Sequence, residues 1–95
     1  MTDRTAYIDK AQARLKQIDA EIARLGARVE EAEADARIEA QQALDEARSK
    51  RREIDQQIAR LRDSSGAAWE DIRDGLDSAW DQMSGALRQA ADRFH

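Results

Sequence analysis

The chain of 95 residues contains no cysteine and no proline, and its only histidine is the last residue, His95. The lack of cysteine excludes a disulfide framework, a thiolate metal site and a cysteine nucleophile. With no histidine inside the chain, neither a Ser-His-Asp arrangement nor the Glu-x-x-His motifs of di-iron bundles can form. Phosphate-loop, calcium-loop and zinc-protease motifs are also missing from the sequence. We therefore expect a non-enzymatic protein that uses no cofactor and no metal.

Aromatic residues and long apolar runs are scarce as well. Aromatic residues make up 4% of the chain, and 19 of its hydrophobic residues are alanines, which leaves few large side chains for a compact core. No segment approaches the roughly 20 apolar residues that a membrane-spanning helix needs. The start of the chain lacks the charged and then apolar pattern of a signal peptide, so the expected location is cytoplasmic.

The charges are balanced over most of the chain. Residues 1–62 hold 13 acidic and 13 basic residues, and the net charge of −4 arises within residues 63–95. An acidic cluster at 30–35 precedes a basic cluster at 48–52, and we interpret the two as complementary patches on helices that pair. The sequence has no overall basic character, so nucleic acid is not an expected partner.

Helix-forming residues dominate the chain from Thr5 to Asp63. Apolar residues recur there at alternating spacings of three and four, which is the heptad pattern of a left-handed coiled coil. A second run follows in a shifted phase, and the 11 residues between Ala36 and Ala47 keep the stripe on one side of a single unbroken helix. Tyr7, beside the stripe, is expected to be a packing residue. The predicted seam, at which helices of an oligomer meet, consists of Ile8, Leu15, Ile18, Ile22, Leu25, Val29, Ile54, Ile58 and Leu61.

The two heptad runs match each other in reverse order. Opposing residue i to residue 83−i pairs Val29 with Ile54 and sets the acidic cluster against the basic one. An antiparallel dimer of long helices satisfies this register, and so does one chain folded into a hairpin near Gln41. Because residues 39–44 contain no Gly, Pro or Asn, we favour the dimer, or a higher bundle, over the hairpin.

A break in the long helix is predicted at residues 64–66. Gly66 can adopt the left-handed conformation that ends many helices, and either serine of this break can cap the helix that follows. The expected organisation is a coiled-coil helix over 1–63 and an amphipathic helix over 67–95.

The last segment repeats every 11 residues from Ala68 onwards, with a tryptophan in each of the first two repeats. This period places the apolar residues in one stripe along a helix, with acidic residues opposite. Docking of the stripe on the coiled coil is the favoured interpretation. Binding to a membrane surface or to a foreign partner is the alternative, although acidic residues stand where interfacial helices usually carry basic ones. The stripe consists of Trp69, Ile72, Leu76, Trp80, Met83, Leu87 and Phe94.

Several short motifs can be compared with a known family. A Ser-Gly-x-Ala-Trp-Glu-Asp block covers residues 65–71, a second Ala-Trp pair lies at 79–80, and an Arg-Phe pair at 93–94. Together with the heptads, these motifs resemble a family of small bacterial coiled-coil proteins from cyanobacteria and proteobacteria, described as coiled-coil-domain or stress-response proteins. The resemblance implies a soluble helical protein without known catalytic activity and with a stress-linked role, and it assigns no functional residues.

We therefore expect an all-α protein in which a long coiled-coil helix and a shorter amphipathic helix assemble as an antiparallel helical dimer or bundle. A helical hairpin plus a third helix is the alternative. The expected function is self-assembly or interaction without catalysis. A peripheral membrane or lipid-binding role through the tryptophan-containing helix is the second hypothesis, and pairing with another helical protein is the third.

Overall fold

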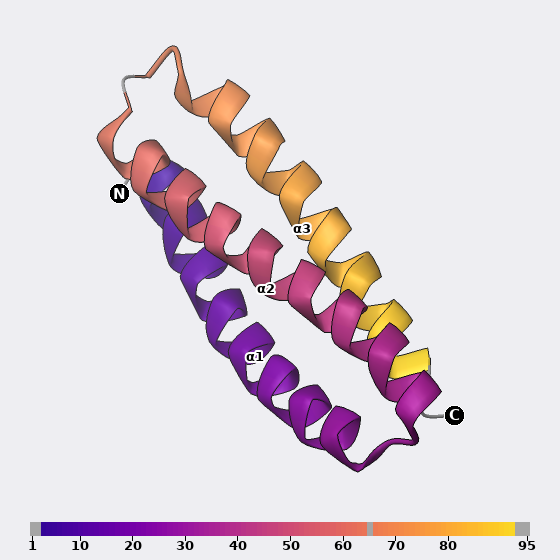
Figure 1. Ribbon diagram of the computed structural model, residues 1–95. Helices are drawn as coiled ribbons and strands as arrows, with labels where there is room; N and C mark the ends of the chain where they lie inside the picture. Colours follow the sequence, from indigo (N-terminus) through magenta and orange to yellow (C-terminus); the bar gives the residue numbers. More distant parts are fainter. Residues whose placement is uncertain (1–2, 65, 93–95) are drawn as a thin grey trace.

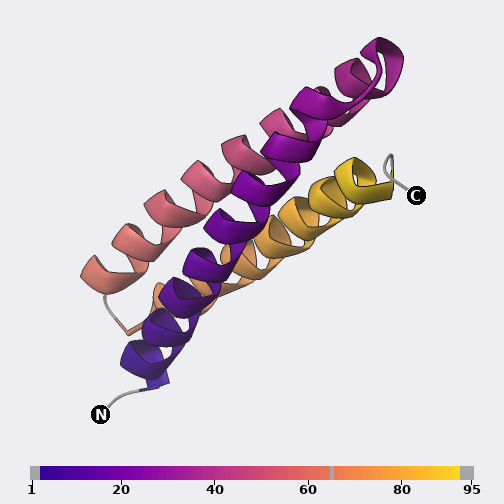
Figure 2. The same cartoon turned by 90° about the horizontal axis from the view of Figure 1, so that it is seen from below.

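The computed structural model describes residues 3–64 and 66–92, which form three α-helices. Helix α1 spans Asp3–Glu31, α2 spans Ala34–Asp63 and α3 spans Trp69–Asp92. The helices lie side by side, with α2 antiparallel to the other two, in an elongated bundle of 49 × 19 × 17 Å (Figures 1 and 2). The described residues contain no strand, and the all-α class is confirmed.

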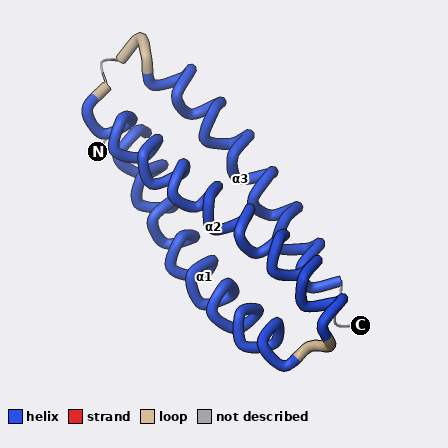
Figure 3. Tube along the Cα trace, viewed as in Figure 1, coloured by secondary structure: helices blue, strands red, loops and turns tan. Residues whose placement is uncertain are grey.

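The chain turns at Ala32 and Glu33, where the helix was expected to continue (Figure 3). The predicted single helix over 1–63 is therefore wrong, and the arrangement is the alternative, a hairpin followed by a third helix. The tip also lies well before Gln41. A turn at this point divides the chain into helices of 29 and 30 residues that pack against each other. Tertiary burial of two matched stripes thus outweighs the local preference for helix.

The turn has few local features that favour it. Glu33 has extended backbone angles, φ −63° and ψ 156°, and its side chain caps no backbone group of α2. The Ala32 N–H donates to the Val29 carbonyl at 3.1 Å, and the Arg37 N–H donates to the Glu33 carbonyl at 2.7 Å. The helix dipoles disfavour Glu31 at the end of α1 but favour Arg28 in its last turn and Asp35 in the first turn of α2, so their net effect on the turn is small. The packing of the helices, rather than the local sequence, therefore holds the turn.

The second break follows α2. Ser64 is extended, and both its N–H, at 3.3 Å, and its Oγ, at 2.8 Å, donate to the Leu61 carbonyl. Ser64 therefore caps the end of α2 and not the start of the next helix as predicted; Ser65 lies outside the described residues. Gly66 has a negative φ, like every described glycine, so the expected left-handed conformation is wrong. The Arg4 guanidinium donates to the Ser64 carbonyl and places a cation at the C-terminal end of α2, where the dipole favours it.

The core follows α2, because α2 packs against both other helices and most closely against α3, while α1 and α3 touch sparingly. Buried apolar residues from all three helices form one cluster. Alanines are buried on α2, at Ala40 and Ala47, and on α3, at Ala86 and Ala90. Small side chains allow two helices to approach closely, and this compensates for the shortage of large apolar residues. The most enclosed large side chains are Leu44, Ile54, Leu61, Leu76, Met83 and Val29.

Candidate interaction surfaces

The predicted seam residues all lie between helices of the same chain. Ile18 is partly buried and packs against the core, and the other eight are buried. The heptad pattern thus selected residues that pack helix against helix. In this structure their partners are the other helices of one bundle, and the seam is covered without a second chain.

The stripe of the last helix also faces the bundle. Leu76, Trp80, Met83 and Leu87 are buried in α3, while Trp69 and Ile72 are partly buried against the core. Phe94 lies outside the described residues. The described part of the stripe is thus docked on the other helices, as in the favoured interpretation of this segment.

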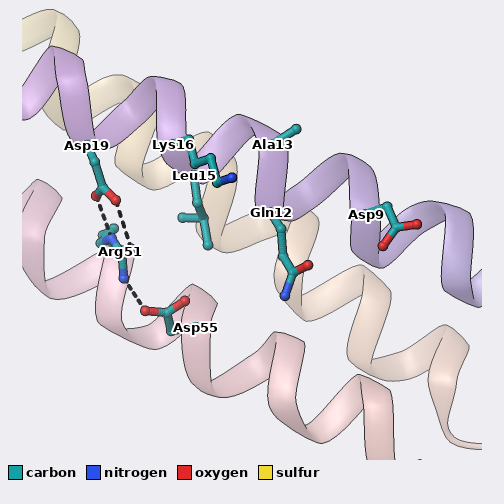
Figure 4. A pocket seen from close by; sticks show the side chains of 8 residues that line it. All are labelled: Asp9, Gln12, Ala13, Leu15, Lys16, Asp19, Arg51 and Asp55. Atoms are coloured by element: carbon teal, nitrogen blue, oxygen red, sulfur yellow. Dashed lines mark hydrogen bonds and ion pairs between the residues drawn. The ribbon is translucent and has the colours of Figure 1, made fainter.

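An open groove of about 670 Å³ runs between α1 and α2, and a charge network crosses it. Arg51 of α2 reaches over to α1, where its Nε donates to Asp19 Oδ1 at 2.7 Å and its Nη2 donates to Asp19 Oδ2 at 2.9 Å. Its Nη1 donates to Asp55 on its own helix, so the guanidinium lies between two carboxylates (Figure 4). Such two-bond contacts fix the relative position of the helices that carry them. The groove is lined by Asp9, Gln12, Ala13, Leu15, Lys16, Asp19, Arg51 and Asp55.

The pair Arg51–Asp19 also reveals the register of the hairpin. Its residue numbers add up to 70 rather than the predicted 83, a shift that follows from the earlier turn. The hydrogen bonds from Arg51 hold the pKa of Asp19 below its usual range, and the same bonds raise the pKa of Arg51. The sequence pattern indicated Arg51 as part of the basic cluster at 48–52, and it did not identify Asp19. A basic residue inside an apolar stripe was the available signal, because it needs a carboxylate on the facing helix.

The pair permits a test of this register. Replacing Asp19→Asn is expected to lower the free energy of unfolding at neutral pH by about 0.5 kcal/mol, since the Asp19 side chain is 49% exposed and surface pairs contribute little. Because the pKa of Asp19 is lowered in the folded state, its contribution is present above the ordinary value of about 3.9 and is lost as the pH falls through the folded value. Urea unfolding at neutral and acidic pH measures both effects. The control is Asp9→Asn, which lies in the same groove but away from Arg51 (Figure 4). An equal loss of stability in Asp9→Asn would contradict the pairing of Asp19 with Arg51.

A second cluster joins the first half of α1 to α3. The Tyr7 hydroxyl donates to Asp77 Oδ1 at 2.6 Å, and the Tyr7 ring meets the Trp69 ring edge-on with centroids 6.4 Å apart. The Arg14 guanidinium lies 4.4 Å from the centre of the Trp80 ring, within the range of a cation–π contact. Tyr7 packs as expected, whereas its hydrogen bond to α3 was not predicted. These contacts place both tryptophans at the junction with α1.

Tyr7 makes the stability depend on pH in the alkaline range. Burial, and then the hydrogen bond to Asp77, raise the pKa of Tyr7 above its ordinary value near 10. The folded state therefore favours the neutral phenol, and the stability that this group contributes is present below pH 10 and is lost as the pH rises further. We expect Tyr7→Phe to be less stable than the unchanged chain at neutral pH, and we expect that deficit to shrink at alkaline pH. Urea unfolding of both proteins at neutral and alkaline pH checks this, and a deficit that stays constant would contradict it.

The other half of α1 is less well covered. An open groove of about 350 Å³ separates it from α3, with Ile18 on one side and Leu87 and Ala91 on the other. Together with the sparse contact between these two helices, this groove means that α1 is held in the bundle chiefly by α2.

No family model, no curated protein and no solved structure matches the chain. The resemblance to the bacterial coiled-coil proteins therefore stays a prediction.

Within residues 3–64 and 66–92, no group of three or more His, Cys, Asp or Glu residues is placed to hold a metal ion. The described helices include none with the length and apolar character needed to cross a membrane.

Proposed function

We propose that this chain is a non-enzymatic helical interaction protein that assembles with further copies of itself in the cytoplasm. The observation that carries the proposal is the pairing of α1 with α2, two amphipathic helices of 29 and 30 residues with buried stripes in antiparallel register. The Arg51–Asp19 bridge flanks these stripes. This is the chemistry of coiled coils, in which the apolar seam provides affinity and the flanking charges set orientation and register.

The same pairing is available between two chains. Helix α1 is attached mainly through α2, so its release breaks that principal interface together with the contacts of Tyr7 and Arg14 with α3. A released α1 exposes a row of large apolar residues that includes Leu15, Ile22 and Val29. An exposed apolar surface of this kind favours association with another apolar surface. A second copy supplies an α2 with the matching stripe and the matching arginine.

Membrane or lipid binding through α3 has less support. The residues that would enter the headgroup region include Trp80 and Met83, which are buried in the bundle, so binding would require α3 to leave it. Vesicles with anionic lipids would then shift the tryptophan emission to the blue, and we expect no such shift.

Pairing with another helical protein uses the same α1 surface as self-assembly. A stress-linked role rests on the family resemblance alone.

Sedimentation equilibrium tests self-assembly directly. Over roughly 10 μM to 1 mM protein, mass action is expected to raise the average mass from 10.7 kDa towards twice that value. A mass that stays at 10.7 kDa throughout this range would overturn the proposal.

A further inference from the structure

We infer that two copies of this chain pair by exchanging α1, with the turn at Ala32 and Glu33 straightened into one continuous helix over residues 3–63. The inference rests on the proposed self-assembly and gives its mechanism. The α1 of each copy then lies on the α2 of the other copy, while each α3 stays on its own α2, its closest partner.

The residues of the turn favour the straight form. Alanine and glutamate are good helix formers, and Glu33 gives α2 no side-chain cap. The last carbonyls of α1 and the first N–H groups of α2 lack partners within their own helices while the chain is bent. Straightening restores these hydrogen bonds, while the dipole contributions of Glu31, Arg28 and Asp35 at the two helix ends disappear together. Short hinges of this kind are the sites at which domains exchange.

The apolar stripe continues across the straightened turn. Val29, Ala32, Ala36 and Ala40 follow one another at spacings of three, four and four, which places them on one face of a helix. Ala32 and Ala36 are half-buried and the other two are buried. The residue numbers of Arg51 and Asp19 add up to 70, so residue i of one copy faces residue 70−i of the other. The two-fold axis of an exchanged pair therefore passes near residue 35, beside these alanines. Small residues at this crossing let the two long helices approach closely.

Exchange keeps the contacts that hold the bundle and changes only which chain makes them. The Arg51–Asp19 bridge forms twice between the chains, and the Tyr7–Asp77 hydrogen bond also passes to the partner. The gain is the helix at the hinge. Opposing it are the entropy of association and repulsion between the acidic residues 30–35 of the two chains near the axis. Exchange therefore depends on protein concentration.

Complementation of reversed charges distinguishes exchange from any other mode of assembly. In Asp19→Arg two arginines face each other across α1 and α2, and in Arg51→Asp two aspartates do so. In either variant alone the repulsive pair is present in the monomer and in the exchanged dimer alike, so each variant is expected to associate about as the unchanged chain does. In a mixed exchanged dimer, one bridge joins the introduced arginine to the introduced aspartate and the other bridge is the original one. The mixture is therefore expected to associate about 10-fold or more tightly than either variant alone, measured by sedimentation and by native mass spectrometry.

Proline at the first residue of α2 locks the hairpin. Ala34→Pro suits the bent chain, because proline is accepted at the first helical position and Glu33 already has the extended backbone that a residue before proline prefers. Inside a continuous helix the same proline destabilises the helix. Because an exchanged dimer contains two such hinges, association is expected to weaken by at least about 1,000-fold. Ala34→Ser, which both forms accept, is the control. Circular dichroism of each variant checks that it is folded.

The outcomes separate the two proposals. An unchanged chain that stays monomeric at every concentration overturns the proposed self-assembly and the exchange together. If the unchanged chain dimerises but mixing the charge variants gives no tighter association, exchange alone is overturned. The same holds if Ala34→Pro dimerises as tightly as Ala34→Ser.

Discussion

Replacing Ile54→Ala is expected to lower the free energy of unfolding by about 3 kcal/mol, because the change removes three buried carbons and leaves a cavity that a packed bundle fills only in part. Ile54 lies on α2 at the centre of the core, where its exposed fraction is 0%. Urea unfolding followed by circular dichroism measures the change. For a chain of this size such a loss is a large part of the total stability.

The same helix offers a matched control. Ile38 is also an isoleucine of α2, but its exposed fraction is 58%. Replacing Ile38→Ala is expected to change the stability by less than about 0.5 kcal/mol, and alanine's helix propensity favours a small gain. Similar losses in the two variants would show that α2 presents another face to the core.

Replacing Leu76→Asp is expected to release α3 from the bundle, or to unfold it, with a loss of about 4 kcal/mol or more at neutral pH. The exposed fraction of Leu76 is 0%, so the introduced carboxylate has to leave water without a partner. Tryptophan emission, shifted to the red as Trp80 becomes exposed, reports the release, and urea unfolding gives the loss. Burial raises the pKa of a carboxyl group, so the folded variant binds a proton more readily and regains stability as the pH falls.

Gln82→Asp is the control for this prediction. It introduces the same acidic group on the same helix, at a position that the structure leaves exposed. Its stability is expected to stay within about 0.5 kcal/mol of the unchanged chain. If Leu76→Asp were no more harmful than Gln82→Asp, the α3 stripe would not be the docked face. The hypothesis that α3 binds a membrane would then gain support.

Periodicity identified the residues of the core well, because it depends only on which side chains share a face of a helix. The seam residues from Ile8 to Leu61 and the described stripe residues of α3 are buried or partly buried in the structure. Periodicity could not say whether the facing helix belongs to the same chain. The hydrophobic effect is non-directional and does not depend on which chain supplies the partner. A helix of the same chain and a helix of another chain therefore bury an apolar stripe equally well.

The position of the turn and the charge pairs were not predictable in the same way. Ala32 and Glu33 carry no turn-forming side chain, so local rules favour helix through the place where the chain bends. Without the bend the register is unknown, and without the register Asp19 cannot be matched to Arg51. Similarly, Tyr7 and Asp77 are 70 residues apart, and only the return of the chain through α2 brings them together.

The sequence by itself determined the all-α class of this protein, which faces of its helices are apolar, and that the chain breaks after residue 63. These properties follow from side-chain propensity and from the 3.6-residue period, both of which act over a few turns. Only the tertiary structure decided that the first long stripe folds back on itself, and at which residue. That choice depends on the matched lengths of α1 and α2 and on the burial of residues such as Leu44 across the whole bundle. Because the bend is held by this packing and not by its own residues, it is also the place where we expect two chains to exchange.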